Sequence, residues 1–502
     1  MAMSDSPTTD DTTSNTPFLK FPPTSPITIH PTPTSGRAVF TTRPLSPGTT
    51  LLHTPALPID VILREYRREV CGWCFHYDEG RTLPIKRLLK EVGFVFCGEE
   101  CAREWERDVG TLGREAWGVV EGFVRGGAGG KGWGNGGGGG GGKGNGNGRQ
   151  NGSGSKKGVE IDGLDGSATE EDADGDVGIP DAEVPRPGEE EIAAAWRWGE
   201  MAREDIVAAR DGSRVKSHSK TLNMVLGTRP DADVLSFLLS GVLCRARSSE
   251  VASMSEIPQE QETGNEGEGK EGDDERETKT TVQDGNQETV STTNSSSSTA
   301  TPTPTPTSPP SPPILSSSPW STILALHPSQ LPYPSSPILY THILTFCHLL
   351  ALLPPPLLPF LTKSTCLATI NRDACNSFGI RSLDDGGDEF FGYGVWPDAS
   401  YFNHSCEPAV GKERVGREWR FWCKGAVGEG EEVGISYLGG EERDLGLAER
   451  RERLWTGWGF WCACGKCVRE EREEVEKNGS VEGVGSGGNS GGGTSGDTME
   501  VD

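Results

Sequence analysis

Residues 403–406 read Asn-His-Ser-Cys, and residues 462–467 read Cys-Ala-Cys-Gly-Lys-Cys. The second stretch can place three thiolates on one turn around a tetrahedral metal ion, which leaves the fourth ligand position empty. A cysteine at the end of the first stretch is a natural fourth ligand. We therefore expect a metal site that joins the C-terminal segment to the 401–406 loop, with free thiols in a buried turn as the alternative. Its ligands are Cys406, Cys462, Cys464 and Cys467.

A second set of cysteines lies closer to the N-terminus, as Cys71-x2-Cys74 and Cys97-x3-Cys101 with 22 residues between the pairs. Two cysteine pairs on separate turns are the usual geometry of a structural zinc site. Packed cysteines are the alternative, and His76 is a possible substitute ligand. Four protein ligands leave no open position for water, so this zinc is expected to be structural rather than hydrolytic.

Composition limits how much of the chain can fold. Of its 502 residues, 69 are glycine and 35 are proline, and hydrophobic residues make up only 33%. We expect one composite catalytic domain that is interrupted by disordered insertions. The net charge of −26 argues against a basic nucleic-acid-binding surface. It favours attraction of basic polypeptides, or it only keeps the linkers soluble.

Cysteine usage and the N-terminus bear on the compartment. The chain has 13 cysteines, an odd number, and a polar, acidic start without the apolar core of a signal peptide. We expect an intracellular protein with thiolate–metal sites, in the nucleus, the cytoplasm or both. The most apolar stretch, 338–353, is too short to span a membrane and ends at three prolines, so it is interpreted as a buried helix. No membrane contact is expected.

Local patterns predict alternating ordered and disordered segments. Strands are expected at 37–42 and 50–53, and helices at 189–210, 232–247 and 320–352. The Gly-rich run 126–154 is typical of a flexible linker. The Ser/Thr/Pro-rich run 249–318 is either a plain solvated linker or a docking site for SH3 or WW-type modules.

Taken in order, four motifs resemble SET-domain methyltransferases. They are GRAVFTTRPLSPGTTLL at the N-terminus, YFNHSCEPAV, GEEVGISY and the cysteine segment WTGWGFWCACGKC. A zinc segment between the first strands and the rest is similar to the SMYD branch, in which a MYND finger divides the SET domain. DACNSFGI at 373–380 is similar to that branch's Asn-Ser-Phe motif. The resemblance covers about half of the chain.

The resemblance implies protein-lysine methylation with S-adenosylmethionine as cofactor and a histone or another protein as substrate. It implies an α+β fold of small β-sheets with a knotted C-terminal loop, a helical insert and a zinc-bound post-SET segment, with two structural Zn²⁺ ions. Tyr437 takes the place of the catalytic tyrosine and also lies against the cofactor. Tyr401 either packs in the core or lines the lysine channel. Cofactor contacts are implied for Gly36, Arg37, Ala38, Asn376, Asn403 and His404.

The same resemblance divides the chain. A disordered tail is expected at 1–19 and at 471–502, and linkers at 126–188 and 249–318. The ordered parts are then the SET N-terminal part 20–62, the MYND-like zinc segment 63–125, the helical insert 189–248, the SET core 319–440 and the post-SET zinc segment 441–470.

Three departures from the family pattern favour a second interpretation. The second glycine of Gly-Arg-Gly is Ala38, the asparagine after Pro408 is Ala409, and the finger shows four cysteines where a full MYND finger has seven and a histidine. A SET-like scaffold that binds partners without catalysis is therefore the alternative function. The motif tyrosine and the Asn-His pair are present, which favours the enzyme.

Overall fold

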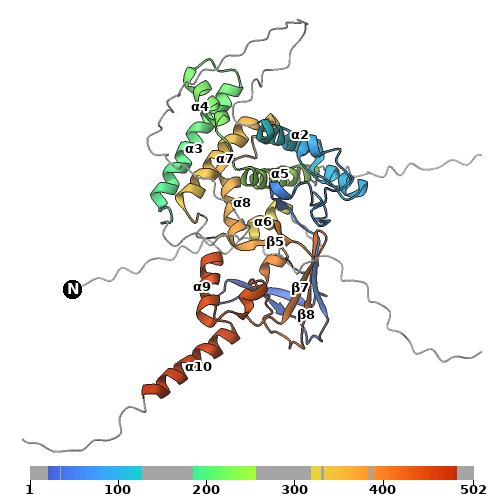
Figure 1. Cartoon of the computed structure of the whole chain (residues 1–502), viewed down its shortest axis with the longest axis vertical. Helices are drawn as coiled ribbons and strands as arrows, with labels where there is room; N and C mark the ends of the chain where they lie inside the picture. The colour runs from blue at the N-terminus through green and yellow to red at the C-terminus, as the bar shows by residue number, and fades with distance from the viewer. Residues whose placement is uncertain are drawn as a thin grey trace, which may run out of the picture.

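A computed structural model of the chain describes residues 21–33, 35–126, 185–255, 318–329, 333–383, 387 and 389–482. The expected N-terminal tail, most of the two expected linkers with the Pro-rich stretch, and the end of the chain lie outside these residues. Within them, most of the helices gather in one half of the molecule, and most of the strands lie in the other half together with the last two helices (Figure 1). No helix of this part of the chain is long and apolar enough to cross a membrane.

The strands form three small antiparallel sheets. β1 (Ile27–Pro31) pairs with β2 (Arg37–Thr41). A second sheet has the order β3 (Thr50–Thr54), β8 (Glu418–Cys423), β7 (Val410–Val415). A third has the order β4 (Ile59–Ile62), β6 (Phe390–Val395), β5 (Ser377–Arg381). Each of the last two sheets joins strands from opposite ends of the chain, so the N-terminal strands complete sheets whose other members come more than 300 residues later.

The helical half is held together by α7 (Ser336–Leu352), which is apolar on nearly all sides and largely buried. Around it lie α2 (Glu99–Gly126), α3 (Glu189–Arg210), α4 (Lys216–Gly227) and α5 (Ala232–Ser255). α8 (Lys363–Asn376) packs on α5. Trp196 of α3 is fully buried against Phe346 of α7, with ring centroids 5.7 Å apart. The described helices therefore include those expected at 189–210 and 232–247.

Shorter elements connect these layers. They are η1 (Arg64–Tyr66), α1 (Leu89–Val92), α6 (Pro319–Ala325), η2 (Pro355–Leu357), η3 (Ala399–Tyr401) and η4 (Gly440–Asp444). α9 (Leu447–Trp458) and α10 (Gly465–Glu482) follow the strands, and α10 extends away from the rest of the molecule (Figure 1).

Three expectations differ from the structure. The helix expected at 320–352 is found as two separate helices, α6 and α7. α5 continues to Ser255, past the helix end expected at 247, and α10 continues to Glu482, into the tail expected to be disordered from 471. In both places the composition becomes polar before the helical hydrogen bonding stops. Charged residues such as the Lys466–Glu470 pair, 3.9 Å apart, suit an exposed helix as well as they suit a disordered tail.

The segment 431–437 lies between β2 and the Asn-His-Ser-Cys loop. On one side the amide of Val433 donates to the carbonyl of Val39 at 2.9 Å. On the other side the amide of Ile435 donates to the carbonyl of Asn403, also at 2.9 Å. One short segment thus satisfies backbone groups from both ends of the chain, which places the expected catalytic tyrosine next to β2 and the loop.

The close approach at this crossing requires glycine at 434. A Cβ atom there would lie 2.7 Å from the carbonyl oxygen of Asn403, closer than such atoms come in real structures. We expect Gly434→Ala to lower the free energy of unfolding by about 1–3 kcal/mol, because the backbone must shift to admit the methyl group. Chemical denaturation measures the change. Gly425→Ala is the matched control, since nothing lies within 4 Å of its added Cβ; equal effects of the two changes would contradict the explanation.

Candidate functional site

The first group of cysteines forms where the turn after η1 meets the start of α2. The Sγ atoms of Cys71, Cys74, Cys97 and Cys101 all lie within 4.8 Å of one another. Cys71 is fully buried, and the other three are partly buried. His76 serves this turn through its backbone, since its carbonyl accepts the amide hydrogen of Cys71 at 2.8 Å. The four predicted ligands therefore come together without the histidine side chain.

The second group joins the loop after η3 to the start of α10. The Sγ atoms of Cys406, Cys462, Cys464 and Cys467 also lie within 4.8 Å of one another. The amide of Cys406 points at the Sγ of Cys464 at 3.4 Å. The predicted link between the Asn-His-Ser-Cys loop and the C-terminal segment is thus present in the structure.

Sulfur spacing distinguishes a metal site from disulfides in both groups. Neighbouring Sγ atoms are separated by 3.5 Å at Cys74–Cys97 and at Cys97–Cys101, and by 3.5 to 3.9 Å around Cys406. A disulfide needs about 2.05 Å. Tetrahedral ligands at a metal–sulfur distance of about 2.3 Å would be about 3.8 Å apart. Both groups therefore have the geometry of a four-thiolate metal site.

A buried arginine supports the second cysteine group, and no sequence pattern predicted it. Arg450 of α9 is 2% exposed, and its Nη2 lies 3.8 Å from the Sγ of Cys467 while it also pairs with Glu470. Its neighbour Arg451 donates from Nε to the carbonyl of Cys462 at 2.9 Å. The run Arg450–Arg453 resembles an ordinary solvated helix face, so only the packing of α9 on α10 reveals this role.

Tyr437 is the centre of the candidate active site. Its hydroxyl donates to the carbonyl oxygen of Phe402 at 2.9 Å, and its amide donates to Nδ1 of His404 at 2.9 Å. Burial, followed by the charge of Cys375, raises the pKa of the Tyr437 hydroxyl well above its ordinary value. The hydroxyl therefore stays protonated near neutral pH and remains a hydrogen-bond donor.

His404 connects Tyr437 to the second cysteine group. Burial lowers the pKa of its imidazole to about 4, so the ring is neutral near pH 7. Because Nδ1 accepts the amide hydrogen of Tyr437, the ring proton resides on Nε2, which lies 3.2 Å from the Sγ of Cys406. This histidine fixes the tyrosine backbone on one side and contacts a thiol of the metal site on the other.

Asn403 joins the loop to the start of β2. Its Nδ2 donates to the carbonyl of Arg37 at 3.2 Å and to Oε1 of Glu432 at 3.3 Å. Gly36, just before the strand, has a φ of +71° and open space on the side where a Cβ would lie. The next residue but one, Ala38, is fully buried. The glycine turn, the asparagine and the tyrosine segment, far apart in sequence, thus share one side of the molecule.

Two further predicted residues lie at the same place. The Arg37 guanidinium sits 5.1 Å from the ring centroid of Tyr401, which is 4% exposed, and also donates to the carbonyl of Ala325 at 2.5 Å. Asn376, at the end of α8, donates from Nδ2 to the carbonyl of His327 at 3.0 Å, and its own carbonyl accepts from Ser400 Oγ beside Tyr401. The structure therefore gathers every predicted cofactor-site residue around β2, η3 and the 431–437 segment.

Aromatic side chains of the C-terminal segment enclose Tyr437. The ring centroid of Trp458 lies 5.5 Å away and that of Phe460 lies 6.2 Å away. Trp455 and Trp461 are more than half exposed. The cysteine group at 462–467 therefore also positions an aromatic rim beside the tyrosine, a consequence that its spacing alone does not show.

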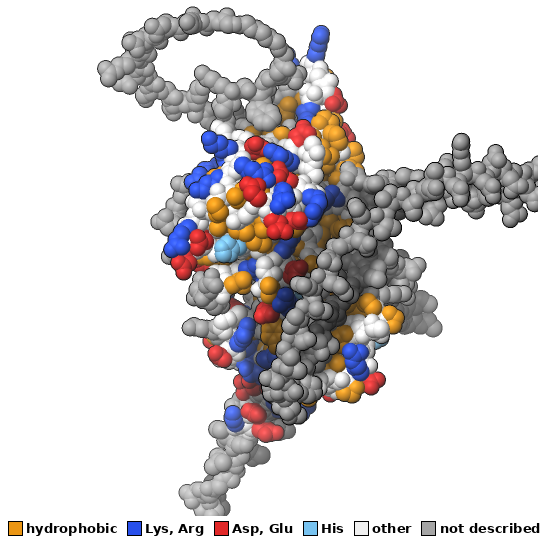
Figure 2. All heavy atoms as spheres, turned by 90° about the vertical axis from the view of Figure 1, so that its right-hand side faces the viewer, with side chains coloured by type: hydrophobic (Ala, Val, Ile, Leu, Met, Phe, Trp, Pro, Cys, Tyr) orange, Lys and Arg blue, Asp and Glu red, His pale blue; other side chains and the backbone are white. Residues whose placement is uncertain are grey.

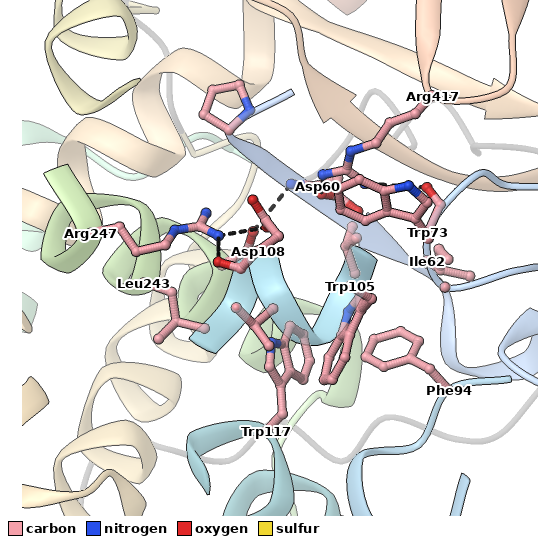
Figure 3. Close-up of a pocket in the computed structure, with 15 residues that line it drawn as sticks. Asp60, Ile62, Trp73, Phe94, Trp105, Asp108, Trp117, Leu243, Arg247 and Arg417 are labelled. Carbon is pink, nitrogen blue, oxygen red and sulfur yellow. Dashed lines mark hydrogen bonds and ion pairs between the residues drawn. The ribbon is translucent and has the colours of Figure 1, made fainter. Parts of the chain in front are cut away.

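The first cysteine group is built into the rest of the protein through a charged junction. Figure 3 shows Arg417 over Trp73, 4.5 Å from the ring centroid, with Asp60 3.2 Å from its guanidinium. Burial raises the pKa of Asp60 even though the arginine charge opposes this. On the other side of the same small cavity, Arg247 of α5 pairs with Asp108 of α2 at 2.6 Å. These charges are paired within the chain, so the junction holds three parts of the molecule together.

Comparison with curated proteins finds SET and SMYD-family relatives of part of the chain. The chain is 36% identical over 135 residues to the potential protein lysine methyltransferase SET6 of Saccharomyces cerevisiae. The aligned region covers 26% of this chain and 36% of that protein. It is 37% identical over 115 residues to a SET and MYND domain-containing protein of Dictyostelium discoideum, covering 22% of each. This chain is a homologue of SET and SMYD-family proteins.

The likeness extends over part of each protein. A histone-lysine N-methyltransferase SET5 of Yarrowia lipolytica is 43% identical over 79 residues, which is 15% of this chain and 17% of that protein. The chain thus aligns with about a third or less of the length of these relatives. No protein-family model matches the chain.

Proposed function

We propose that this protein is an S-adenosylmethionine-dependent protein-lysine N-methyltransferase with a SET-type fold. One observation carries the proposal: the Tyr437 hydroxyl is held on the Phe402 carbonyl where the 431–437 segment crosses the Asn-His-Ser-Cys loop. This crossing would be the knotted C-terminal loop of the fold. The homology to SET and SMYD proteins supports the assignment.

The proposed SET-type fold also divides the chain into domains. The SET domain would consist of residues 20–62 and 319–440, with the zinc segment 63–125 and the helical segment 189–248 inserted into it. Residues 441–470 would form the post-SET zinc segment. The antiparallel sheets that join β3 to β8 and β4 to β6 support this division, because they unite the two parts of the proposed SET domain.

The cofactor would lie beside β2. Its methionine part carries a carboxylate and an ammonium group. The backbone amides of Gly36, Arg37 and Ala38 and the carboxamide of Asn403 could donate to the carboxylate, and the backbone carbonyls could accept from the ammonium group. The open space beside Gly36 leaves room for such a contact. His404 and Asn376 would complete the site. When bound, S-adenosylmethionine supplies a methyl group activated by its sulfonium charge.

The residues of this chain would orient the target lysine and favour the loss of its proton. A lysine amine has a reference pKa of about 10.4 and must lose its proton before it can attack a methyl group. Burial among Tyr437, Tyr401 and Phe402 disfavours the charged ammonium, and the proton leaves to water. The protonated Tyr437 hydroxyl and the neighbouring carbonyls hold the amine in line and stabilise the transition state.

Each cysteine group would hold one structural Zn²⁺. Four thiolates fill a tetrahedral site, so neither ion has an open position for substrate or water. The first ion would fix the zinc segment against the charged junction of Figure 3. The second would hold α9 and α10 against the loop that carries Asn403 and His404.

The substrate would be a basic polypeptide with a target lysine, and a histone is one candidate. Two observations support this: relatives bear the names of histone-lysine methyltransferases, and the net charge is −26. On the face shown in Figure 2, basic and acidic side chains of the described residues are interspersed rather than gathered into a basic field. We propose an intracellular location, in the nucleus or the cytoplasm.

Titration of the purified protein with S-adenosylmethionine tests the proposal, alongside a metal count. We expect binding in the micromolar range and about two zinc ions per chain. Asn403→Ala should weaken binding about tenfold by removing the bond to the Arg37 carbonyl, equivalent to about 1.4 kcal/mol. Zinc without any cofactor binding would instead favour a non-catalytic SET scaffold.

A further inference from the structure

Two arginine side chains meet at the C-terminal end of α6. Arg372 of α8 donates from Nη2 to the carbonyl of Leu324 at 2.8 Å. Arg37 of β2 donates from Nη2 to the next carbonyl along the helix, that of Ala325, at 2.5 Å. Because the two bonds go to consecutive residues, the two guanidinium groups are neighbours, although one belongs to β2 and the other to α8.

This arginine pair borders the proposed cofactor site on two sides. On α8, Asn376 lies one helical turn after Arg372, and its Nδ2 donates to the carbonyls of Arg372 at 2.9 Å and His327 at 3.0 Å. On β2, the carbonyl of Arg37 accepts from Nδ2 of Asn403 at 3.2 Å. Residues already assigned to the cofactor therefore contact each arginine directly.

The charge of Arg372 has no carboxylate partner among the described residues. Asp373, its neighbour in sequence, instead accepts a hydrogen bond from Ser377 Oγ at 2.5 Å. Within the same part of the chain, the Arg372 Nε is buried and has no hydrogen-bond acceptor. Unsatisfied donors and unpaired charges are costly at partly buried positions, so such a side chain calls for an explanation.

The two guanidinium groups also act on each other. Burial lowers the pKa of Arg372, and the positive charge of Arg37 adds to this effect. An anion that contacted both groups would offset their repulsion. Arginine suits a carboxylate in particular, since its planar guanidinium can donate two parallel N–H bonds to the two oxygens. The bond from Arg372 to Leu324 lies at the surface, so a ligand can approach it.

The proposed cofactor brings one anionic group to this place, the carboxylate of its methionine part. The donors assigned to it above are backbone amides and a carboxamide, which are all neutral. A carboxylate that leaves water is stabilised much better by a hydrogen bond from a cation. We propose that Arg372 binds the carboxylate of S-adenosylmethionine, with the Arg37 guanidinium as the second cation. The inference rests on the proposed function, and it adds a contact that would select S-adenosylmethionine over adenosine compounds without a carboxylate.

Isothermal titration of the purified full chain with two ligands tests the inference. They are S-adenosylmethionine and its decarboxylated form, which differ only in the carboxylate. We expect the wild-type protein to bind the decarboxylated form about 10- to 100-fold more weakly. Arg372→Met should weaken the binding of S-adenosylmethionine by a similar factor and leave that of the decarboxylated form unchanged. Arg372→Lys keeps the charge and should recover part of the affinity.

Arg203→Met is the matched control. Arg203 also donates to two backbone carbonyls, those of Leu361 and Leu358, but it lies on α3 in the helical half, so both affinities should stay unchanged. Equal losses for both ligands in Arg372→Met would show that Arg372 only holds α6 in place, and would overturn the inference.

The wild-type protein gives a test that does not depend on how any variant folds. Equal affinity for the two ligands would overturn the inference. If S-adenosylmethionine binds and Arg372→Met leaves its affinity unchanged, the inference fails and the proposed function stands. If the wild-type protein binds neither ligand, the proposed function and the inference fail together.

Discussion

Tyr437→Phe is expected to slow methyl transfer by about 100-fold or more while leaving the fold intact. The change removes one hydroxyl, whose protonated form donates to the Phe402 carbonyl and would orient the acceptor amine. A loss of this size corresponds to about 2.7 kcal/mol of transition-state stabilisation. Transfer of tritium from S-adenosylmethionine to histone measures the rate, and titration with the cofactor shows whether its site persists.

Tyr333→Phe is the matched control for this change. Tyr333 is also buried, and its hydroxyl accepts a hydrogen bond from Nε1 of Trp196 at 3.0 Å in the helical half of the molecule. Its removal should cost about 1 kcal/mol of stability and leave methyl transfer unchanged. Unchanged turnover in Tyr437→Phe would remove this tyrosine from the mechanism, and equal losses in both variants would point to a structural effect.

Cys464→Ser is expected to release one of the two metal ions and to loosen α9 and α10. Structural zinc contributes about 10–16 kcal/mol of apparent binding free energy in small zinc domains, so losing one of four thiolates is a large perturbation. The Cys464 sulfur also accepts from the amide of Cys406, two residues after His404. Atomic absorption should find about one zinc per chain, and protease digestion should cut the C-terminal segment faster.

Methyl transfer should fall in the same variant, although Cys464 does not touch the proposed substrate. The aromatic rim formed by Trp458 and Phe460 lies on the segment that the metal holds, and both rings contact Tyr437. Cys375→Ser makes the same chemical change in a thiol outside both cysteine groups, and it should retain both ions. A Cys464→Ser protein with its full metal content would contradict the assignment of this group as a metal site.

Loss of metal from the two sites should affect the protein differently. The first cysteine group packs against a junction in which Arg417, Asp60 and Trp73 connect the β7–β8 sheet to the zinc segment. Loss of metal there should mainly lower stability. The second group touches the residues that carry the chemistry, because Cys406 contacts His404. Its loss should impair activity even where the remaining fold survives.

Local patterns made several features predictable. The helix at 189–210 was confirmed with both ends correct, because its apolar residues recur at the helical period. The two cysteine groups were predicted with all their members, since thiols at such short spacings can meet around one point. The continuation of α5 and α10 into segments expected to be disordered was not predicted, because polar composition does not by itself stop a helix.

The sequence by itself determined which residue types are available: the cysteine ligands, the Asn-His pair, the tyrosine and the glycine that allows two segments to touch. Only the tertiary structure decided what these residues contact. The bond from Asn403 to the Arg37 carbonyl spans 366 residues, and the Tyr437 partner is a backbone carbonyl that every residue carries. Which face of β8 is buried depends on the register of this strand against β3 and β7. Every residue carries the same backbone groups, so the sequence does not show which carbonyl accepts a given hydrogen bond. The face of a strand that is buried depends on how the strand pairs, so residue spacing alone could not predict it.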